Sequence, residues 1–441
     1  MNNTKLTTLH VLTAMLFAVS GIAQNKIICG HDLYMNQLES KYPGFKESVS
    51  KTFVDTQTKG ATNKTATNSN YVVNVVVHVV WKNAIENLDD SIIQSQIDVL
   101  NEDFNRLNAD SANLRSLFQP IAGNAHITFN LHQIKRVQTT ALFDPSAGGI
   151  PFDMKYDSLG GSSAVDPTHF LNLWICKIQP LTFLGFPVGQ ILGFAFPPAN
   201  LANWPANSEA PAIGEDGVVI DYRCIGRNNP NTISVTGSTN LTIKGRTPVH
   251  EIGHYLGLRH IWGDGSNFGG NNCQGNDGIA DTPNANDQSQ FDCNTTKNTC
   301  VDAALPWTTL DAPDMVENFM DYSAETCMNT FTNGQAAHMQ NILNGPRVGL
   351  LQPVGIMNDI NLASTVLVFP NPAQDFIQLQ SSAKKITTIE LLDITGRSII
   401  AMPSVFDYAV TINTTQVAKG VYSIKLLLEN NNSISKKVII E

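Results

Sequence analysis

The sequence predicts an α+β fold followed by a small all-β sandwich. Two observations carry this prediction. A strand-like run and an amphipathic helix precede several further strand-like runs, which is typical of a mixed twisted sheet with a helix on one face. After residue 364 the chain consists of short alternating strands and turns. The 441 residues are about three times the usual domain size of roughly 150, so two or three domains are expected.

The amino-acid composition indicates where the protein acts and which classes of partner it does not bind. Hydrophobic residues make up 42% of the chain and charged residues only 15%, below the roughly 25% of ordinary soluble proteins. The 28 Lys and Arg residues against 38 Asp and Glu residues give a net charge of -10, and the basic residues form no block. This composition argues against a basic nucleic-acid binder and a multi-span membrane protein. It indicates an extracellular polar surface.

Residues 1–23 have the three parts of a signal peptide. Lys5 supplies positive charge, residues 9–19 are apolar, and Gly21 and Ala23 offer small residues for a cleavage site. The apolar stretch is shorter than the about 20 residues that span a bilayer. We therefore expect export, with the mature protein secreted or held on the cell surface.

The next elements follow in order. Residues 56–70 are too polar to pack, so residues 24–70 are expected to form a propeptide and an exposed, protease-sensitive linker. Residues 71–81 are dense in β-branched side chains and predict a buried strand. In residues 89–107, apolar side chains recur at three- and four-residue steps, which predicts an amphipathic helix reaching Leu107. Further strands are expected over residues 127–131, 170–178, 191–196 and 218–222.

A composition break marks the start of the tail. Gly-Pro and Gln-Pro pairs interrupt the pattern, so residues 71–346 form the predicted main domain and residues 347–364 a linker. Residues 365–441 suffice for a sandwich of about seven strands. They contain no His and no Cys, which favours a carrier or recognition role over catalysis.

Export makes disulfides possible. Seven cysteines are present, and the last four lie close together among loop residues: Cys273, Cys293, Cys300 and Cys327. These four are candidates for two disulfides, and the sequence alone leaves three pairings open. The odd total leaves at least one thiol without an intramolecular partner, and Cys29, isolated near the N-terminus, is the leading candidate.

One motif carries the predicted chemistry. Residues 250–260, HEIGHYLGLRH, match the pattern HExxHxxGxxH in full. His250 and His254 lie one helical turn apart, so both imidazoles can bind one Zn²⁺. Gly257 permits a backbone conformation closed to other residues, which ends the helix and brings His260 round as a third ligand. Three nitrogen ligands leave a fourth position for water, which is typical of a catalytic zinc site.

Glu251 is the predicted general base. It would accept a proton from a zinc-bound water, whose pKa the ion lowers towards about 7, and pass that proton to the leaving amine. The alternative is a structural zinc site, which would need neither Glu251 nor the open position.

Downstream, residues 318–322 read NFMDY. A long zinc motif with a later Met turn resembles the metzincin clan of metalloproteases. The resemblance implies a metzincin-type catalytic domain with a mixed sheet, an active-site helix and a loop-rich C-terminal subdomain. It implies that Met320 forms an apolar floor under the histidines and that Tyr322 stabilises the oxyanion of the tetrahedral intermediate. Without the upstream motif, both would be ordinary core residues.

Within that clan, the chain is similar to the pappalysin family over roughly residues 71–346. The run HEIGHYLGLRHIWGDG, the loop NDGIADTP and the segment NFMDYS with its following cysteine carry the resemblance. It implies two disulfides around the active-site loop, Cys273–Cys300 and Cys293–Cys327.

The loop from Gly263 to Asp287 is rich in oxygen donors. Such loops usually make turns, but clustered carboxylates in an extracellular loop can also bind Ca²⁺. The family resemblance implies structural calcium here, with Asp277, Asp281 and Thr282 as the expected ligands.

Cys29 has three interpretations: an intermolecular disulfide, a small apolar residue, or a metal ligand. Upstream of a zinc motif it resembles a cysteine switch, whose thiolate occupies the fourth zinc position in a latent precursor. Related propeptides often have Arg before this cysteine, where this chain has Ile28. Asp32 is an alternative ligand, because a carboxylate oxygen also binds zinc.

The tail resembles the C-terminal sorting domain of the bacterial type IX secretion system. The motifs that carry this resemblance are VFPNP at 368–372, LDITGR at 392–397, KGVY at 419–422 and SKKVII at 435–440. The resemblance implies that outer-membrane secretion machinery is a partner. The alternative is an adhesive immunoglobulin-like module.

One position bears on specificity. Family members that cleave before Arg or Lys are similar in carrying an acidic residue just before the cysteine that follows the Met turn. Here that position is Thr326, with Glu325 one residue earlier. A hydroxyl cannot pair with a guanidinium as a carboxylate can, so we predict a broader or altered P1′ preference.

Together these features predict a secreted zinc endopeptidase that acts on proteins or peptides. Two rivals stay open: a catalytically inactive surface-binding protein on the same scaffold, and a zinc amidase or deacetylase for small substrates. The presence of Glu251, the three histidines and Tyr322 counts against the first rival. The motif alone does not exclude the second.

Overall fold

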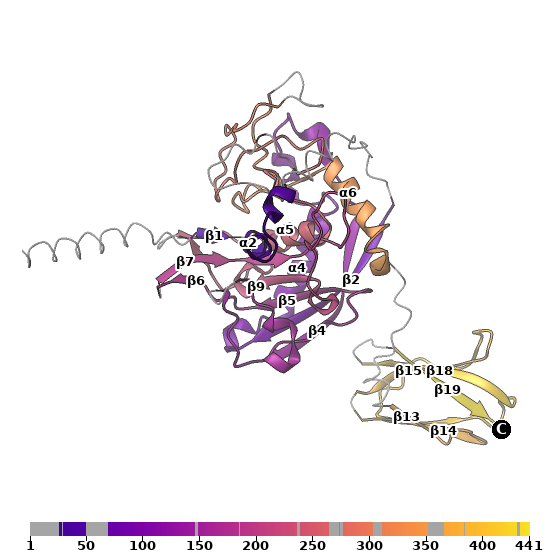
Figure 1. Cartoon of the computed structure of the whole chain (residues 1–441). Coiled ribbons are helices and arrows are strands. Elements are labelled where there is room, and N and C mark those ends of the chain that lie inside the picture. Colours follow the sequence, from indigo (N-terminus) through magenta and orange to yellow (C-terminus); the bar gives the residue numbers. More distant parts are fainter. Residues whose placement is uncertain are drawn as a thin grey trace, which may run out of the picture. The chain divides into compact units, whose positions relative to one another are not determined.

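Figure 1 shows the fold in a computed structural model of the chain. The structure describes residues 26–28, 30–49, 69–145, 149–184, 186–235, 239–263, 273, 277–302, 311–351, 366–382, 384–429 and 433–441. The predicted signal peptide, Cys29 and most of both predicted linkers lie outside these residues. The chain divides into two compact units, Met1–Leu351 and Gln352–Glu441, and the division falls within the predicted linker 347–364.

A five-stranded sheet forms the core of the larger unit. Its strands, in spatial order, are β4 (Ile127–Gln138), β2 (Tyr71–Trp81), β5 (Leu171–Cys176), β9 (Val218–Asp221) and β8 (Gly193–Ala195). The first four strands are parallel, and β8 runs antiparallel at the edge. Every residue of β5 and β9 is buried, as expected for strands covered on both faces. The predicted α+β class is confirmed.

Helix α4 (Asp90–Asp103) is the predicted amphipathic helix, but it ends earlier than the sequence suggests. Ile93, Ile97 and Leu100 bury its apolar face in the main core. Beyond the helix, Arg106 has a φ of 51°, and the Leu107 N–H donates to the Glu102 carbonyl. This turn leaves Leu107 73% exposed, so its assignment to the apolar face is wrong.

The predicted strand over residues 191–196 is divided between two sheets. Strand β7 (Phe186–Ile191) forms a separate sheet with β6 (Leu181–Phe183) and β1 (Lys26–Ile28), while β8 joins the main sheet. Strand β1 pairs in parallel with β7, from Lys26 opposite Gly189 to Ile28 opposite Ile191. The N-terminal segment therefore runs beside the strand that leads into β8.

Helix α2 (Gly30–Lys41) follows β1 and packs into the larger unit. One buried cluster contains side chains from both: Tyr34, Met35 and Leu38 of α2 with Phe194, Phe196 and Trp204. Glycine is required at the start of α2, because a Cβ on Gly30 would lie 2.6 Å from Cβ of Phe194. The segment before the linker is thus part of one hydrophobic core.

Two further helices complete the larger unit. Helix α5 (Arg246–Tyr255) carries the HExxH motif, and α6 (Asn333–Leu343) begins at a capping box formed by Thr332 and Gln335. The short strands pair as β3 (Ala122–Gly123) with β12 (Phe331–Thr332) and β10 (Ser234–Val235) with β11 (Thr239–Asn240). Single-turn 3₁₀ helices cover Ala84–Glu86, Ala109–Asn113, Gln119–Ile121, Asp153–Lys155, Asp157–Leu159, Ile213–Glu215, Tyr222–Cys224 and Val348–Leu351.

The smaller unit is an all-β sandwich, as predicted. Its described residues form seven strands: β13 (Val366–Phe369), β14 (Phe376–Ser381), β15 (Ile386–Leu392), β16 (Ser398–Met402), β17 (Ala409–Asn413), β18 (Gly420–Leu428) and β19 (Ser433–Ile440). These strands make two antiparallel sheets, β13-β14-β17 and β16-β15-β18-β19. Alternate residues of β14, Ile377 and Leu379 among them, are buried between the sheets.

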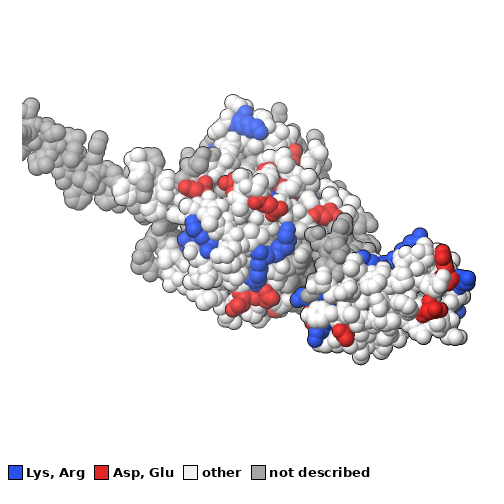
Figure 2. All heavy atoms as spheres, turned by 90° about the horizontal axis from the view of Figure 1, so that it is seen from below, with Lys and Arg blue, Asp and Glu red and all other residues white. Residues whose placement is uncertain are grey.

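Cys176 on β5 and Cys224 after β9 are free thiols and fully buried. On the face in Figure 2, basic and acidic side chains are interspersed over a mostly uncharged surface on each unit. Among the described residues, no helix is both long and apolar enough to span a bilayer.

Candidate active site

Helix α5 carries His250, Glu251 and His254, all buried, into the middle of the larger unit. Gly257 follows the helix with a φ of +81°, the left-handed conformation that the motif predicts. The resulting turn reverses the chain, and His260 meets the two helical histidines.

The three histidines direct their Nε2 atoms to one point. The distances between these atoms are 3.1 Å from His250 to His254, 3.1 Å from His254 to His260 and 3.3 Å from His250 to His260. Nδ1–H of His250 donates to the Phe319 carbonyl at 2.8 Å, and Nδ1–H of His254 donates to the Leu258 carbonyl at 2.9 Å. With the protons on Nδ1, the Nε2 lone pairs of these two rings face the common point.

This arrangement fits a metal ion. Nitrogens bound at 2.0–2.1 Å to a tetrahedral ion would lie about 3.3 Å apart. Burial, together with the neighbouring histidines, lowers the pKa of His254 well below its ordinary value, so the ring stays neutral and able to ligate. Within the described part of the chain, these histidines are the one group of three potential ligands that converge in this way.

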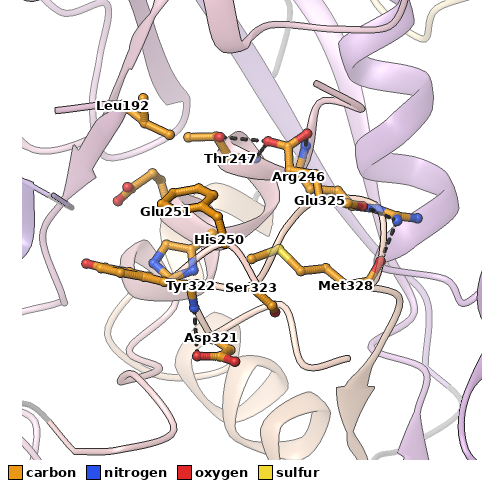
Figure 3. Close-up of a pocket in the computed structure, with 11 residues that line it drawn as sticks. Leu192, Arg246, Thr247, His250, Glu251, Asp321, Tyr322, Ser323, Glu325 and Met328 are labelled. Carbon is orange, nitrogen blue, oxygen red and sulfur yellow. Dashed lines mark hydrogen bonds between the residues drawn. The ribbon is translucent and has the colours of Figure 1, made fainter. Parts of the chain in front are cut away.

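Glu251 and Tyr322 flank the histidines without joining the ligand group. Glu251 packs against β8, where a Cβ on Gly193 would lie 2.9 Å from Glu251 Cγ. The Tyr322 ring centroid lies 5.5 Å from that of His250 and 4.9 Å from that of His260. The Glu251 carboxylate and the Tyr322 hydroxyl point in the same direction past His250 (Figure 3). Both therefore lie beside the histidine cluster.

Met320 lies beneath α5. Its side chain is fully buried, and a Cβ on Gly253 would overlap its sulfur atom. The Asn318 carboxamide oxygen accepts a hydrogen bond from the Met320 N–H at 2.9 Å, which shapes the turn. The close approach of Met320 therefore explains why a variable position of the motif holds glycine.

His31 lies beside the histidine cluster, a position that no motif of the sequence predicts. Its ring stacks on that of His254, with centroids 4.9 Å apart and planes at 14°, and lies edge-on to Trp204 at 5.0 Å. His31 is 1% exposed. The sequence offers one signal for His31, its position two residues after Cys29. Cys29 itself lies outside the described residues. The N-terminal segment thus covers the histidine cluster.

A pocket opens beside His250 and Glu251 (Figure 3). Its lining includes the side chains Leu192, Phe291, Tyr322, Met328, Arg246 and Glu325. Thr326 is exposed and does not belong to this lining; its hydroxyl lies 3.7 Å from Cys293 Sγ. The residue that directly precedes Cys327 is therefore outside the pocket wall.

The loop region holds two disulfides, Cys273–Cys300 and Cys293–Cys327. These are the pairs that the family resemblance implies. The second disulfide ties the segment after the Met turn to the loop that precedes it.

The calcium candidates lie in a buried, oxygen-rich part of this loop. Asp277 and Thr282 are buried, and Asp281 Oδ2 accepts the Gly334 N–H at 2.8 Å. Among the described residues, Asp281 Oδ1 and Thr282 Oγ1 are buried without a hydrogen-bond partner. Burial also raises the pKa of Asp281. Such oxygens fit a hard cation, although several other candidate donors of the loop lie outside the described residues.

Comparison with known proteins agrees with this geometry. The family model described as pregnancy-associated plasma protein-A, Peptidase_M43, matches residues 229–344. The model of the secretion system C-terminal sorting domain matches residues 367–441. The chain is 25% identical over 339 residues to an extracellular metalloprotease of Arthroderma benhamiae, covering 77% of this chain and 91% of the relative.

Two solved structures are more similar still. Mature mirolysin of Tannerella forsythia, in complex with a cleaved peptide, is 35% identical with a TM-score of 0.52, covering 65% of this chain and 97% of that chain. A variant of its precursor promirolysin is 33% identical with a TM-score of 0.54, covering 72% and 95%.

The fold and the site therefore define a metalloprotease of the metzincin type. The chain belongs to the pappalysin family, and it carries a secretion-system sorting domain that marks it for the cell surface or the medium.

Proposed function

We propose that the protein is a zinc-dependent endopeptidase with Glu251 as its general base. The observation that carries this proposal is the convergence of three Nε2 atoms beside a buried carboxylate that is not a ligand. His250, His254 and His260 hold the ion. When bound, zinc supplies a Lewis acid and lowers the pKa of a water ligand.

The protein's own side chains move the proton and stabilise charge. Glu251 accepts the proton of the attacking water and transfers it to the leaving amine. The Tyr322 hydroxyl donates a hydrogen bond to the oxyanion that develops on the scissile carbonyl. Because the histidines are buried, these interactions act in a region of low dielectric, where they are stronger than in water.

The test combines zinc analysis with digestion of casein, with and without a chelator, after removal of the N-terminal segment. The proposal expects one zinc per chain and casein cleavage that chelation stops. An inactive surface-binding protein would hold zinc without cleaving anything. A small-substrate amidase would leave casein intact and hydrolyse blocked amino acid amides. Either result would replace the proposal.

We also propose that the chain is made as a latent precursor in which residues 24–70 form the propeptide and Cys29 ligates the zinc. Ile28 pairs with Ile191, Gly30 lies against Phe194, and His31 stacks on the metal-binding cluster. Ile28 and Gly30 are the sequence neighbours of Cys29, and their contacts support this role. The similarity to promirolysin also supports a precursor form.

Structural calcium is a further proposal for the loop. Asp277, Asp281 and Thr282 are the proposed ligands, supported by the buried and unpaired Asp281 Oδ1 and Thr282 Oγ1. Bound calcium would bring this loop to its folded geometry and hold it against α6 through the Asp281 bond to Gly334.

The remaining segments are proposed to direct export. Residues 1–23 act as a signal peptide at the inner membrane, and residues 365–441 act as the sorting domain at the outer membrane. The match of the sorting-domain model to residues 367–441 supports the second role and makes outer-membrane secretion machinery the expected partner.

A further inference from the structure

A pocket opens beside His250 and Glu251, next to the proposed base, where the substrate side chain adjacent to the scissile bond would lie. This inference rests on the proposed peptidase function and deepens it. We infer that the pocket selects an uncharged, apolar side chain, and that Glu325 does not serve as a receptor for Arg or Lys.

The acceptor positions of Glu325 are already occupied. Its Oε2 accepts the backbone N–H groups of Lys244 and, at 3.1 Å, of Arg246. Its Oε1 accepts the Thr247 backbone N–H at 2.8 Å and the Thr247 hydroxyl at 2.7 Å (Figure 3). A carboxylate offers about four lone-pair sites, so none is left for a guanidinium or an ammonium group.

These hydrogen bonds explain the position of the Glu325 carboxylate. Helix α5 begins after Gly245, whose lack of a side chain leaves the first helical N–H groups without an ordinary cap. Glu325 supplies that cap from a distant part of the chain, and its negative charge complements the positive end of the helix dipole. Its charge stabilises the zinc-binding helix and is directed away from the substrate.

Arg246 gives the pocket a cation of its own. The guanidinium donates to both oxygens of Asp110, at 2.7 and 2.6 Å, and to Asp103 at 3.3 Å. It also donates to the carbonyls of Glu325 and Met328. Its partners are thereby fixed, so neither Asp103 nor Asp110 is available to a basic substrate side chain.

Two other polar side chains of the lining, Ser323 and Asp321, are directed away from the pocket. The Ser323 hydroxyl donates to the Val316 carbonyl. Asp321 is fully buried: its Oδ1 accepts the backbone N–H groups of Tyr322 at 2.8 Å and Ser289 at 3.1 Å, and its Oδ2 has no hydrogen-bond partner among the described residues. Figure 3 places its carboxylate beyond the Tyr322 backbone, on the side away from Leu192.

What remains for the substrate is an apolar surface formed by Leu192, Phe291, Met328 and the Tyr322 ring. An apolar side chain leaves water for this surface without losing a hydrogen bond. A basic side chain would be desolvated without a partner, which is unfavourable. We therefore expect Leu, Met or Phe at P1′ to exceed Arg and Lys in kcat/KM by about 100-fold.

The test uses the processed, zinc-loaded enzyme and a set of peptides that differ only at P1′: Leu, Met, Phe, Arg and Lys. Faster cleavage of the apolar members supports the inference. Preference for Arg or Lys overturns it while leaving the peptidase function intact. Cleavage of no peptide and no protein, with zinc bound, overturns the peptidase function and the inference with it.

Two variants test which residues determine the P1′ preference. In Glu325→Gln the P1′ Leu:Arg ratio stays within about twofold of the wild type while the melting temperature falls, because the residue caps α5 and does not touch substrate. A fall of tenfold or more in Arg cleavage relative to Leu would identify Glu325 as a basic-residue receptor and contradict the inference.

Leu192→Asp places a carboxylate without assigned partners on the pocket wall and should raise the Arg:Leu ratio at least tenfold. An unchanged ratio in an active Leu192→Asp enzyme would show that this pocket does not receive the P1′ side chain.

Discussion

The imidazole of His31 lies nearly parallel to that of His254, with 4.9 Å between the ring centroids. His254 belongs to the metal-binding helix, and His31 belongs to the segment that precedes the polar linker. The same His31 ring lies 6.0 Å from that of His260. His31 covers this side of the histidine cluster, and the contact therefore supports the proposed latency.

Latency should weaken when either Cys29 or His31 is replaced. Cys29→Ala removes the proposed thiolate ligand, and His31→Ala removes the ring that covers His254. Both precursors should process themselves faster and show activity before processing. The measurement is the activity and cleavage time course of unprocessed protein at equal concentration.

Two matched variants make this comparison specific. Tyr42→Ala alters an exposed residue beyond α2 and should stay as latent as the wild type. Asp32→Ala tests the alternative zinc ligand, whose side chain lies outside the described residues. If Cys29→Ala remains as latent as the wild type, the cysteine switch is refuted.

Replacing Glu251 should stop the chemistry and leave the metal. Glu251→Ala removes the proposed base without removing a ligand, so peptidase activity should fall by several orders of magnitude while zinc content is unchanged. Zinc analysis and casein digestion on one sample measure both quantities. Substantial turnover by the pure variant would contradict the mechanism.

Gly253→Ala should damage the site through packing alone. The added methyl group would overlap the sulfur of Met320, and overpacking of this kind typically costs about 1–3 kcal/mol of folding free energy. We expect a lower melting temperature and reduced activity. Gly214→Ala is the control, since a Cβ there has no atom within 4 Å and should change neither quantity. Equal behaviour of the two variants would argue against the Met320 contact.

Acid should destabilise the fold through His78. Burial lowers the pKa of His78 to about 4, although its hydrogen bond with Asn172 opposes this shift. Between pH 6.5 and 4 the unfolded chain is protonated at His78 and the folded chain is not. Stability therefore falls as pH decreases across this window, by about 3 kcal/mol at most.

The experiment measures the free energy of unfolding of His78→Gln and its parent at pH 7 and pH 4.5, both in the Glu251→Ala background to prevent self-cleavage. The difference between the two proteins should shrink at the lower pH. A difference that is the same at both pH values would rule out this role of His78.

Removing residues 365–441 should separate folding from export. The sandwich has its own core, and the division of the chain falls before it, so the truncated protein should fold and cleave casein. In the native host it should accumulate in the periplasm. Normal amounts of truncated enzyme outside the cell would disprove the sorting role.

The sequence was most informative where local geometry decides the structure. One helical turn separates His250 from His254, and the left-handed turn at Gly257 follows from the same motif, so the cluster could be predicted without the rest of the fold. Leu107 shows the limit of periodicity. The apolar spacing continues past Asp103, but helix α4 ends there and the chain turns at Arg106.

The features that were missed depend on distant contacts. His31 comes over His254 only because α2 buries its apolar side chains against Trp204 and Phe196. Glu325 caps α5 across the fold, a partnership that carries no local pattern. Such contacts are set by the packing of whole elements, and a single sequence does not encode them in any short window.

The burial of Cys176 and Cys224 has a consequence for oxidative folding. Leaving Cys29 aside, the other six cysteines could pair in fifteen ways if all reached an oxidant, whereas four could pair in only three. Both thiols lie fully buried, one on a central strand of the main sheet and the other directly after its neighbour, so closure of that sheet withdraws them from exchange. Burial also raises the pKa of both, which suppresses the reactive thiolate. A chain that forms its sheet before it meets an oxidant thus protects itself from most incorrect crosslinks, and one that is oxidised too early does not.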